Sequence, residues 1–183
     1  MRRVAAVGIL LVLALTGCSP QPETKSAVVS ADGVTFRDGA DGNATFVSFD
    51  LRPEQFAARL TDVLGKPTQT QPAEPDDPEW KNVTWGGLGV FVGLGDPAPT
   101  AVFADVAEVR GYALTTTDGY QVGKPFPLQG AEASCALGDN TLYNSLPDSS
   151  GGRSITLQTA SQASGGDVPV VSRFMAPTFV QGC

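Results

Sequence analysis

The clearest helical periodicity in the chain lies in residues 53–65 (PEQFAARLTDVLG). Its apolar positions follow i, i+4, i+7 and i+8 spacing, which is typical of one continuous helix face. These positions are Phe56, Leu60, Val63 and Leu64. Pro53 suits the first helical turn, and Gly65 followed by Pro67 ends the helix. An isolated amphipathic helix has to bury its stripe, so core packing on a sheet is favoured over a partner-binding helix.

Short β-rich runs separated by turn residues surround this helix. Residues 27–30 and 34–37 enclose the turn dipeptide Asp32-Gly33, and residues 81–85 and 88–93 enclose Gly86-Gly87. Other strand-length runs are residues 44–49, 100–109, 111–117, 154–160 and 168–174. One helix among many strands predicts an α+β fold, mainly antiparallel sheet with the helix packed on one face.

An acidic, proline-rich stretch, residues 69–79, is predicted to be an exposed loop. Strand parity places Trp85 on the apolar face and Trp80 on the polar face beside this stretch. Trp80, Glu74, Asp76 and Asp77 are therefore a candidate contact surface. A buried Trp80 and a merely solvated connection are the interpretations that we favour.

A second cluster of turn residues, Asp38 to Asn43, contains two Asp-Gly pairs. It does not meet the spacing of a calcium-binding loop, because no Glu stands where the bidentate ligand is required. We interpret the cluster as a solvated turn.

The N-terminus combines two arginines with an uncharged apolar run, residues 4–15, and then Leu15-Thr16-Gly17-Cys18. The apolar run is short for a membrane-spanning helix, which needs about 20 residues, but suits a signal peptide. The four residues before the polar chain resemble the lipobox of bacterial lipoproteins: aliphatic, small, small, cysteine. An uncleaved anchor helix is the alternative.

The lipobox resemblance implies that Cys18 carries acyl chains and becomes the first residue of the mature protein. It predicts a signal peptide at residues 1–17, a polar tether at 18–26 and a single α+β domain at 27–183. Two or three acyl chains hold a protein stably on a bilayer. The expected location is the cell membrane, lipid-anchored on its extracytoplasmic face.

Composition narrows the expected chemistry. The signal removes two of the 12 basic residues and none of the 19 acidic ones, so the net charge changes from −7 to −9. This balance argues against nucleic acid as a partner. Histidine is absent, which removes His-dependent triads and the commonest transition-metal ligand. We expect no cofactor and no metal.

Cys135 and Cys183 are the two cysteines of the predicted mature domain besides Cys18. In an oxidising compartment an even pair favours a disulfide over two reactive thiols. A bridge between them would also hold the last residue of the chain to the domain.

The order of elements from Phe46 to Cys183 is similar in outline to the β-lactamase-inhibitor-protein-like fold of small lipoproteins. Gly123-Lys124-Pro125 repeats Gly65-Lys66-Pro67, which raises the hypothesis of two degenerate halves, 46–117 and 118–183. The residues before Gly123 lack the helical stripe. This resemblance implies no site residues.

No motif identifies a reaction, and the favoured function is a membrane-anchored binding or interaction module for an unknown envelope protein or small ligand. The first alternative is an envelope-polymer hydrolase that uses carboxylates; its acidic candidates include Glu54, Glu108, Glu132 and Asp139. The second is a structural subunit of an envelope complex.

Overall fold

The computed structural model describes residues 25–39, 42–74, 77–93, 101–133, 141–147, 153–159 and 168–178. In these residues there are one α-helix and thirteen β-strands. The elements are β1 (Lys25–Val29), β2 (Gly33–Arg37), β3 (Ala44–Ser48), α1 (Pro53–Leu64), β4 (Gln69–Glu74), β5 (Asp77–Trp85), β6 (Leu88–Gly93), β7 (Ala101–Ala104), β8 (Glu108–Val109), β9 (Tyr112–Thr116), β10 (Glu132–Ala133), β11 (Leu142–Pro147), β12 (Ser154–Thr159) and β13 (Val171–Thr178). Within the described ranges, no helix combines the length and apolar character that crossing a bilayer demands.

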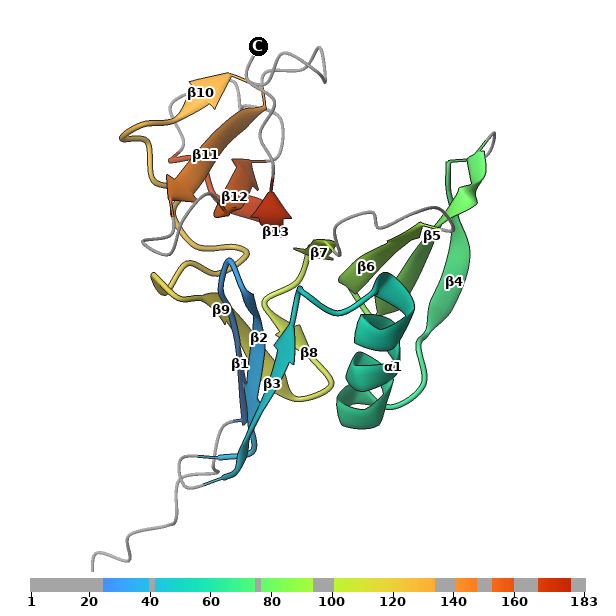
Figure 1. The fold of residues 1–183 in the computed structure, drawn as a ribbon. Helices are drawn as coiled ribbons and strands as arrows, with labels where there is room; N and C mark the ends of the chain where they lie inside the picture. Colours follow the sequence, from blue (N-terminus) through green and yellow to red (C-terminus); the bar gives the residue numbers. More distant parts are fainter. Residues whose placement is uncertain are drawn as a thin grey trace, which may run out of the picture.

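The strands form two sheets (Figure 1). The smaller one has five strands in the order β3-β2-β1-β9-β8, and the larger one has eight in the order β10-β11-β12-β13-β7-β6-β5-β4. Neighbouring strands are antiparallel except β1 and β9, which are parallel. The protein is thus α+β and dominated by antiparallel sheet, as the sequence predicts.

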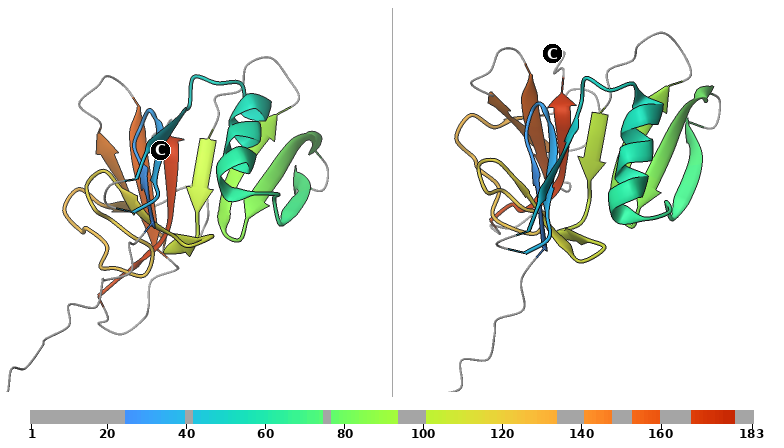
Figure 2. Two further views of the ribbon diagram at one scale, coloured as in Figure 1. Left: turned by 90° about the horizontal axis from the view of Figure 1, so that it is seen from below. Right: turned by 60° about the horizontal axis from the view of Figure 1, so that its bottom comes forward.

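The two sheets and the helix make two layers around one core (Figure 2). The eight-stranded sheet is one layer, and the small sheet and α1 lie side by side over its face. Both components of the second layer bury their apolar sides against the large sheet. The largest fully buried side chains are Trp85, Phe36, Phe56, Phe174, Leu60, Leu88, Leu114, Leu157, Val29, Val34, Val47 and Val90.

Helix α1 has the bounds and the buried face that its sequence predicts. Phe56 and Leu60 are fully buried, Leu64 is nearly so, and Val63 is half-buried. Gly65 follows the helix with φ +78°, a conformation that favours glycine, and its N–H donates to the Thr61 carbonyl over 2.9 Å. Phe56, Leu60 and Leu64 of the helix stripe therefore belong to the core, as the sequence predicts.

The predicted loop at residues 69–79 is wrong. Residues 69–74 and 77–85 are paired as β4 and β5, with Gln69 opposite Thr84 and Glu74 opposite Asp77. Pro72 is accommodated because β4 is the edge of the sheet, where a missing N–H costs no ladder bond. Pro78 lies beyond Trp80, the last β5 residue that pairs with β6.

Two other boundaries differ from the sequence interpretation. The small sheet begins at Lys25, which pairs with Tyr112, so residues 25 and 26 belong to a strand and not to the tether. Among the described residues of the second predicted half, 118–183, there is no helix, and β13 pairs with β7 of the first half.

Candidate functional site

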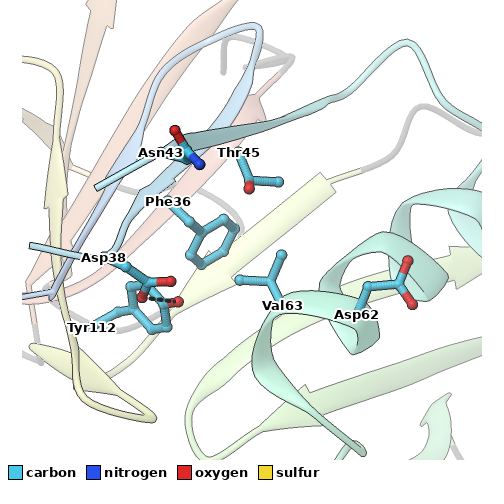
Figure 3. A pocket seen from close by; sticks show the side chains of 7 residues that line it. All are labelled: Phe36, Asp38, Asn43, Thr45, Asp62, Val63 and Tyr112. Atoms are coloured by element: carbon cyan, nitrogen blue, oxygen red, sulfur yellow. Dashed lines mark hydrogen bonds between the residues drawn. The ribbon is translucent and has the colours of Figure 1, made fainter. Parts of the chain in front are cut away.

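A cavity of about 210 Å³ lies between the lower end of the small sheet and helix α1 (Figure 3). We call it the β3–α1 cavity. Its lining side chains come from β2, β3, β9, the connection between β2 and β3, and helix α1. They are Phe36, Asp38, Asn43, Thr45, Asp62, Val63 and Tyr112. At the cavity, the small sheet and α1, which together form the second layer, no longer contact each other.

Two aromatic rings of the core form the floor of this cavity. Phe36 of β2 and Tyr112 of β9 meet edge to face, with ring centroids 5.3 Å apart and planes at 85°. Thr45 of β3 lies on the same face of the sheet as Phe36, since the two are register partners. Thr45 is exposed and Val63 only half-buried because the small sheet and α1 leave this space between them.

A polar network holds Asp38 at the rim. The Tyr112 hydroxyl donates to Asp38 Oδ1 over 2.7 Å, and Lys25 Nζ lies 2.9 Å from the same oxygen. The Lys25 ammonium also lies 5.1 Å from the centre of the Tyr112 ring. These contacts join the start of β1, the turn after β2 and the start of β9.

The network shifts the ionisation of all three groups. The hydrogen bonds from Lys25 and then Tyr112 lower the pKa of Asp38. The bond to Asp38 raises the pKa of Lys25, and burial, followed by the bond to Asp38, raises the pKa of Tyr112. Asp38 is therefore an anion at neutral pH, Lys25 a cation and Tyr112 a neutral phenol.

Several polar groups of the cavity remain without a protein partner. Among the residues that the structure describes, nothing bonds to Asp38 Oδ2 or to the Asn43 and Thr45 side chains. Asp62 has only Arg59, at 3.8 Å between largely exposed side chains. The cavity thus presents two carboxylates, a hydroxyl and an amide to an incoming group.

No family model matches this chain, and no curated protein or solved structure matches it.

The described lining of the cavity includes none of the site residues singled out in the sequence. Cys18, Cys135, Cys183 and Asp76 lie outside the described residues. Glu74 and Asp77 face each other at the tip of the β4–β5 hairpin, and Trp80 lies in β5; the description covers their backbone only. Trp85 is fully buried, as predicted.

The described lining also includes none of the acidic residues considered for hydrolysis. Glu54 is exposed in the first turn of α1, Glu108 is exposed in β8, Glu132 lies in β10, and Asp139 is outside the description. In the described part of the chain, no group of three or more His, Cys, Asp or Glu residues is arranged to hold a metal ion.

Sequence reasoning missed the residues that do line the cavity. Asp38 and Asn43 belong to the cluster that we interpreted as a solvated turn, Val63 was assigned to the core face of the helix, and Asp62 was given no role. The deciding contact joins Asp38 to Tyr112, 74 positions apart. No local pattern signals a pair of that separation.

Proposed function

We propose that this protein is a binding module, anchored by lipid at Cys18 on the extracytoplasmic face of the membrane, whose site is the β3–α1 cavity. The observation that carries the proposal is a set of polar side chains that line this cavity and keep hydrogen-bonding capacity that the described residues do not use. Here Asp38, Asn43, Thr45 and Asp62 converge on one space without bonding one another.

The position of the cavity supports a role near the bilayer. Lys25, where the described chain begins, bonds directly to Asp38 at the cavity rim. Cys18 precedes Lys25 by seven residues, and an extended chain of that length spans at most about 25 Å. Lipidation at Cys18 would hold the cavity within this reach of the membrane and raise its effective concentration for membrane-associated partners.

The ionisation of Asp38 favours binding over hydrolysis. A carboxyl that acts as general acid at neutral pH needs a raised pKa, whereas Lys25 and Tyr112 lower the pKa of Asp38. A fixed anion with one free oxygen suits recognition of a hydrogen-bond donor or a cation.

The experiment is site-specific photo-crosslinking of the full chain in native membranes. Benzoylphenylalanine replaces Thr45, at the cavity, or Asp118, an exposed turn residue that serves as the control. We expect a discrete adduct from position 45 only, and Val63→Trp, which fills the cavity, should remove that adduct.

Identical adducts from both positions, or none from position 45, would contradict the proposal. A stable stoichiometric partner that copurifies without crosslinking favours a structural subunit instead. Cleavage of peptidoglycan that is lost in Asp38→Asn or Asp62→Asn favours the hydrolase.

A further inference from the structure

Strand β3 is an edge strand of the five-stranded sheet, and its free side borders the β3–α1 cavity. The direction of its main-chain groups follows from two hydrogen bonds. Ser30 N–H donates to Gly33 O over 2.9 Å, so Ser30 and Gly33 are a hydrogen-bonded pair of the β1–β2 hairpin. Phe49 N–H donates to Asp32 O over 2.8 Å, so Asp32 and Phe49 are such a pair between β2 and β3.

Hydrogen-bonded and non-hydrogen-bonded pairs alternate along antiparallel strands. Applying this alternation from either hydrogen bond gives the same result. The N–H and C=O groups of Val34 and Phe36 point toward β3, and those of their register partners Val47 and Thr45 point toward β2. Ala44 and Phe46 therefore direct their N–H and C=O groups to the free edge. These four groups have no partner among the described residues.

The side chains along this edge alternate between two environments. Thr45 points into the β3–α1 cavity, as Figure 3 shows. Phe46 points to the opposite face of the sheet, where it is 56% exposed. An exposed phenyl ring beside free strand amides is an exception to how proteins usually protect their edges, which carry charges or proline instead.

We propose that β3 binds an extended peptide as an added strand, with a lysine or arginine of that peptide in the β3–α1 cavity. This inference rests on the proposed function and names the class of its partner. An antiparallel strand would form hydrogen-bonded pairs with Ala44 and Phe46. Strand addition of this kind draws affinity from main-chain bonds and specificity from alternate side chains.

The register then assigns each side chain of the peptide. The residue opposite Thr45 lies on the cavity side, at the short separation of a non-hydrogen-bonded pair. It extends toward Asp38 and Asp62, each of which has one oxygen in contact with a basic side chain, Lys25 or Arg59, and a second oxygen that can accept N–H groups from a cationic residue. The residue opposite Phe46 lies on the other face and contacts the exposed ring, which favours an apolar side chain.

The recognised sequence is thus an apolar residue followed directly by a basic one, in the order that an antiparallel strand imposes. A small free amine would satisfy the carboxylates but would leave the amides of Ala44 and Phe46 unused. The free edge is the reason that the geometry favours a peptide.

The test measures fluorescence anisotropy of the labelled, capped peptide Val-Phe-Lys-Thr-Val with the full-length protein in detergent micelles. We expect the Lys→norleucine peptide to bind more weakly and the Lys→Glu peptide to bind about tenfold more weakly than the lysine peptide, because two carboxylates face this position. N-methylation of the peptide's phenylalanine, which removes one main-chain donor to β3, should also cost about tenfold.

Two protein variants probe the same contacts from the other side. Ala44→Pro removes an outward N–H without breaking the β2–β3 ladder, since proline is tolerated on edge strands, and should weaken the lysine peptide about tenfold. Asp62→Asn should weaken it roughly threefold, the range of an exposed charge pair. Asp118→Asn, which removes an exposed charge elsewhere, should leave affinity unchanged.

Equal binding of the lysine and glutamate peptides, no effect of N-methylation, or no binding at all would overturn the peptide inference. The peptide inference would also be overturned if ethanolamine or glucosamine displaced the labelled peptide and bound wild type and Ala44→Pro with equal affinity. The cavity would then be a site for small amines. If one of these results occurs but a specific crosslink forms at position 45, the proposed binding function is still supported. If the crosslink is also absent, both the peptide inference and the proposed function are refuted.

Discussion

Trp85 shows how one side chain joins elements that are distant in sequence. It is fully buried, and its indole N–H donates to the Gly65 carbonyl over 2.7 Å. The bond satisfies the polar end of a large apolar side chain, which buried tryptophans usually require. It also joins the end of α1 to strand β5, so the helix is held against the large sheet at the residue that terminates it.

Gly89 is needed for a different reason, the close approach of an aromatic ring. It pairs with Phe103 across β6 and β7, and a Cβ at Gly89 would lie 2.1 Å from Phe103 Cζ. Phe103 in turn contacts Phe91, with centroids 4.9 Å apart, and Arg173, whose guanidinium lies 5.3 Å from the ring centre. The ring therefore has little freedom to move away.

We predict that Gly89→Ala destabilises the protein by about 1–3 kcal/mol, the usual cost of overpacking. In the double variant Gly89→Ala with Phe103→Leu, the loss should be smaller than the sum of the single losses, because the smaller side chain relieves the clash. Urea unfolding of the four proteins measures this coupling. Strict additivity would show that the ring does not rest on Gly89.

At the scale of elements, one arginine joins the two layers at the end opposite the cavity. Arg153 begins the segment that leads into β12, and its Nη2 lies 2.6 Å from Asp50 Oδ1 in the connection between β3 and α1. Its Nη1 lies 3.6 Å from Asp32 in the β1–β2 turn. The segment before β12 of the large sheet is thus bonded to the β1–β2 turn and to the connection that follows β3.

We predict that Arg153→Met raises the pKa of Asp50 toward its ordinary value of 3.8, because the hydrogen bond from Arg153 is the main cause of its lowered pKa. A lowered pKa contributes stability above the ordinary value, and this contribution is lost as the pH falls through the folded value. The variant should therefore lose less stability between neutral pH and about pH 3 than wild type.

The Asp50 pKa is measured by NMR titration of the carboxyl carbon, and stability by urea unfolding at the two pH values. Arg59→Met, which removes an exposed arginine of α1 paired with Asp62, is the control and should leave the Asp50 titration unchanged. An unchanged Asp50 titration in Arg153→Met would mean that the bond between layers is not formed in solution.

At the scale of the whole molecule, the cavity and Lys25, the first residue of β1, lie at the same end. Strand β1 starts at this end, and β9 runs parallel to it, so Lys25 and Tyr112 begin their strands side by side (Figure 1). Asp38 completes the contact from the turn after β2. The start of β1 therefore lies at the cavity rim.

We predict that Cys18→Ser moves the protein from the membrane fraction to the soluble fraction or leaves an uncleaved precursor, because the lipobox cysteine is the only acyl acceptor that the motif supplies. Fractionation followed by intact-mass measurement distinguishes the two outcomes. Cys135→Ser is the matched control and should leave acylation unchanged. Acyl chains retained in Cys18→Ser would refute the anchor and, with it, the placement of the cavity near the bilayer.

Local chemistry in the sequence determined the helix and the hairpins. The stripe from Phe56 to Leu64, the positive-φ glycines at 86 and 87, and the buried parity of Trp85 all act over a few residues. Such patterns can be recognised in the sequence because the residues that form them are close together in the chain. The same reasoning failed at residues 69–79, where prolines predicted a loop but the free side of a sheet edge accommodates them.

Only the tertiary structure decided which distant segments meet. The pairing of β13 with β7, the parallel contact of β1 with β9 and the bond from Tyr112 to Asp38 join residues separated by 70 to 87 positions. Each depends on how two layers close over one shared core, a property of the whole chain and of no single segment. The cavity exists because the small sheet and α1 cover the large sheet side by side without meeting at one end.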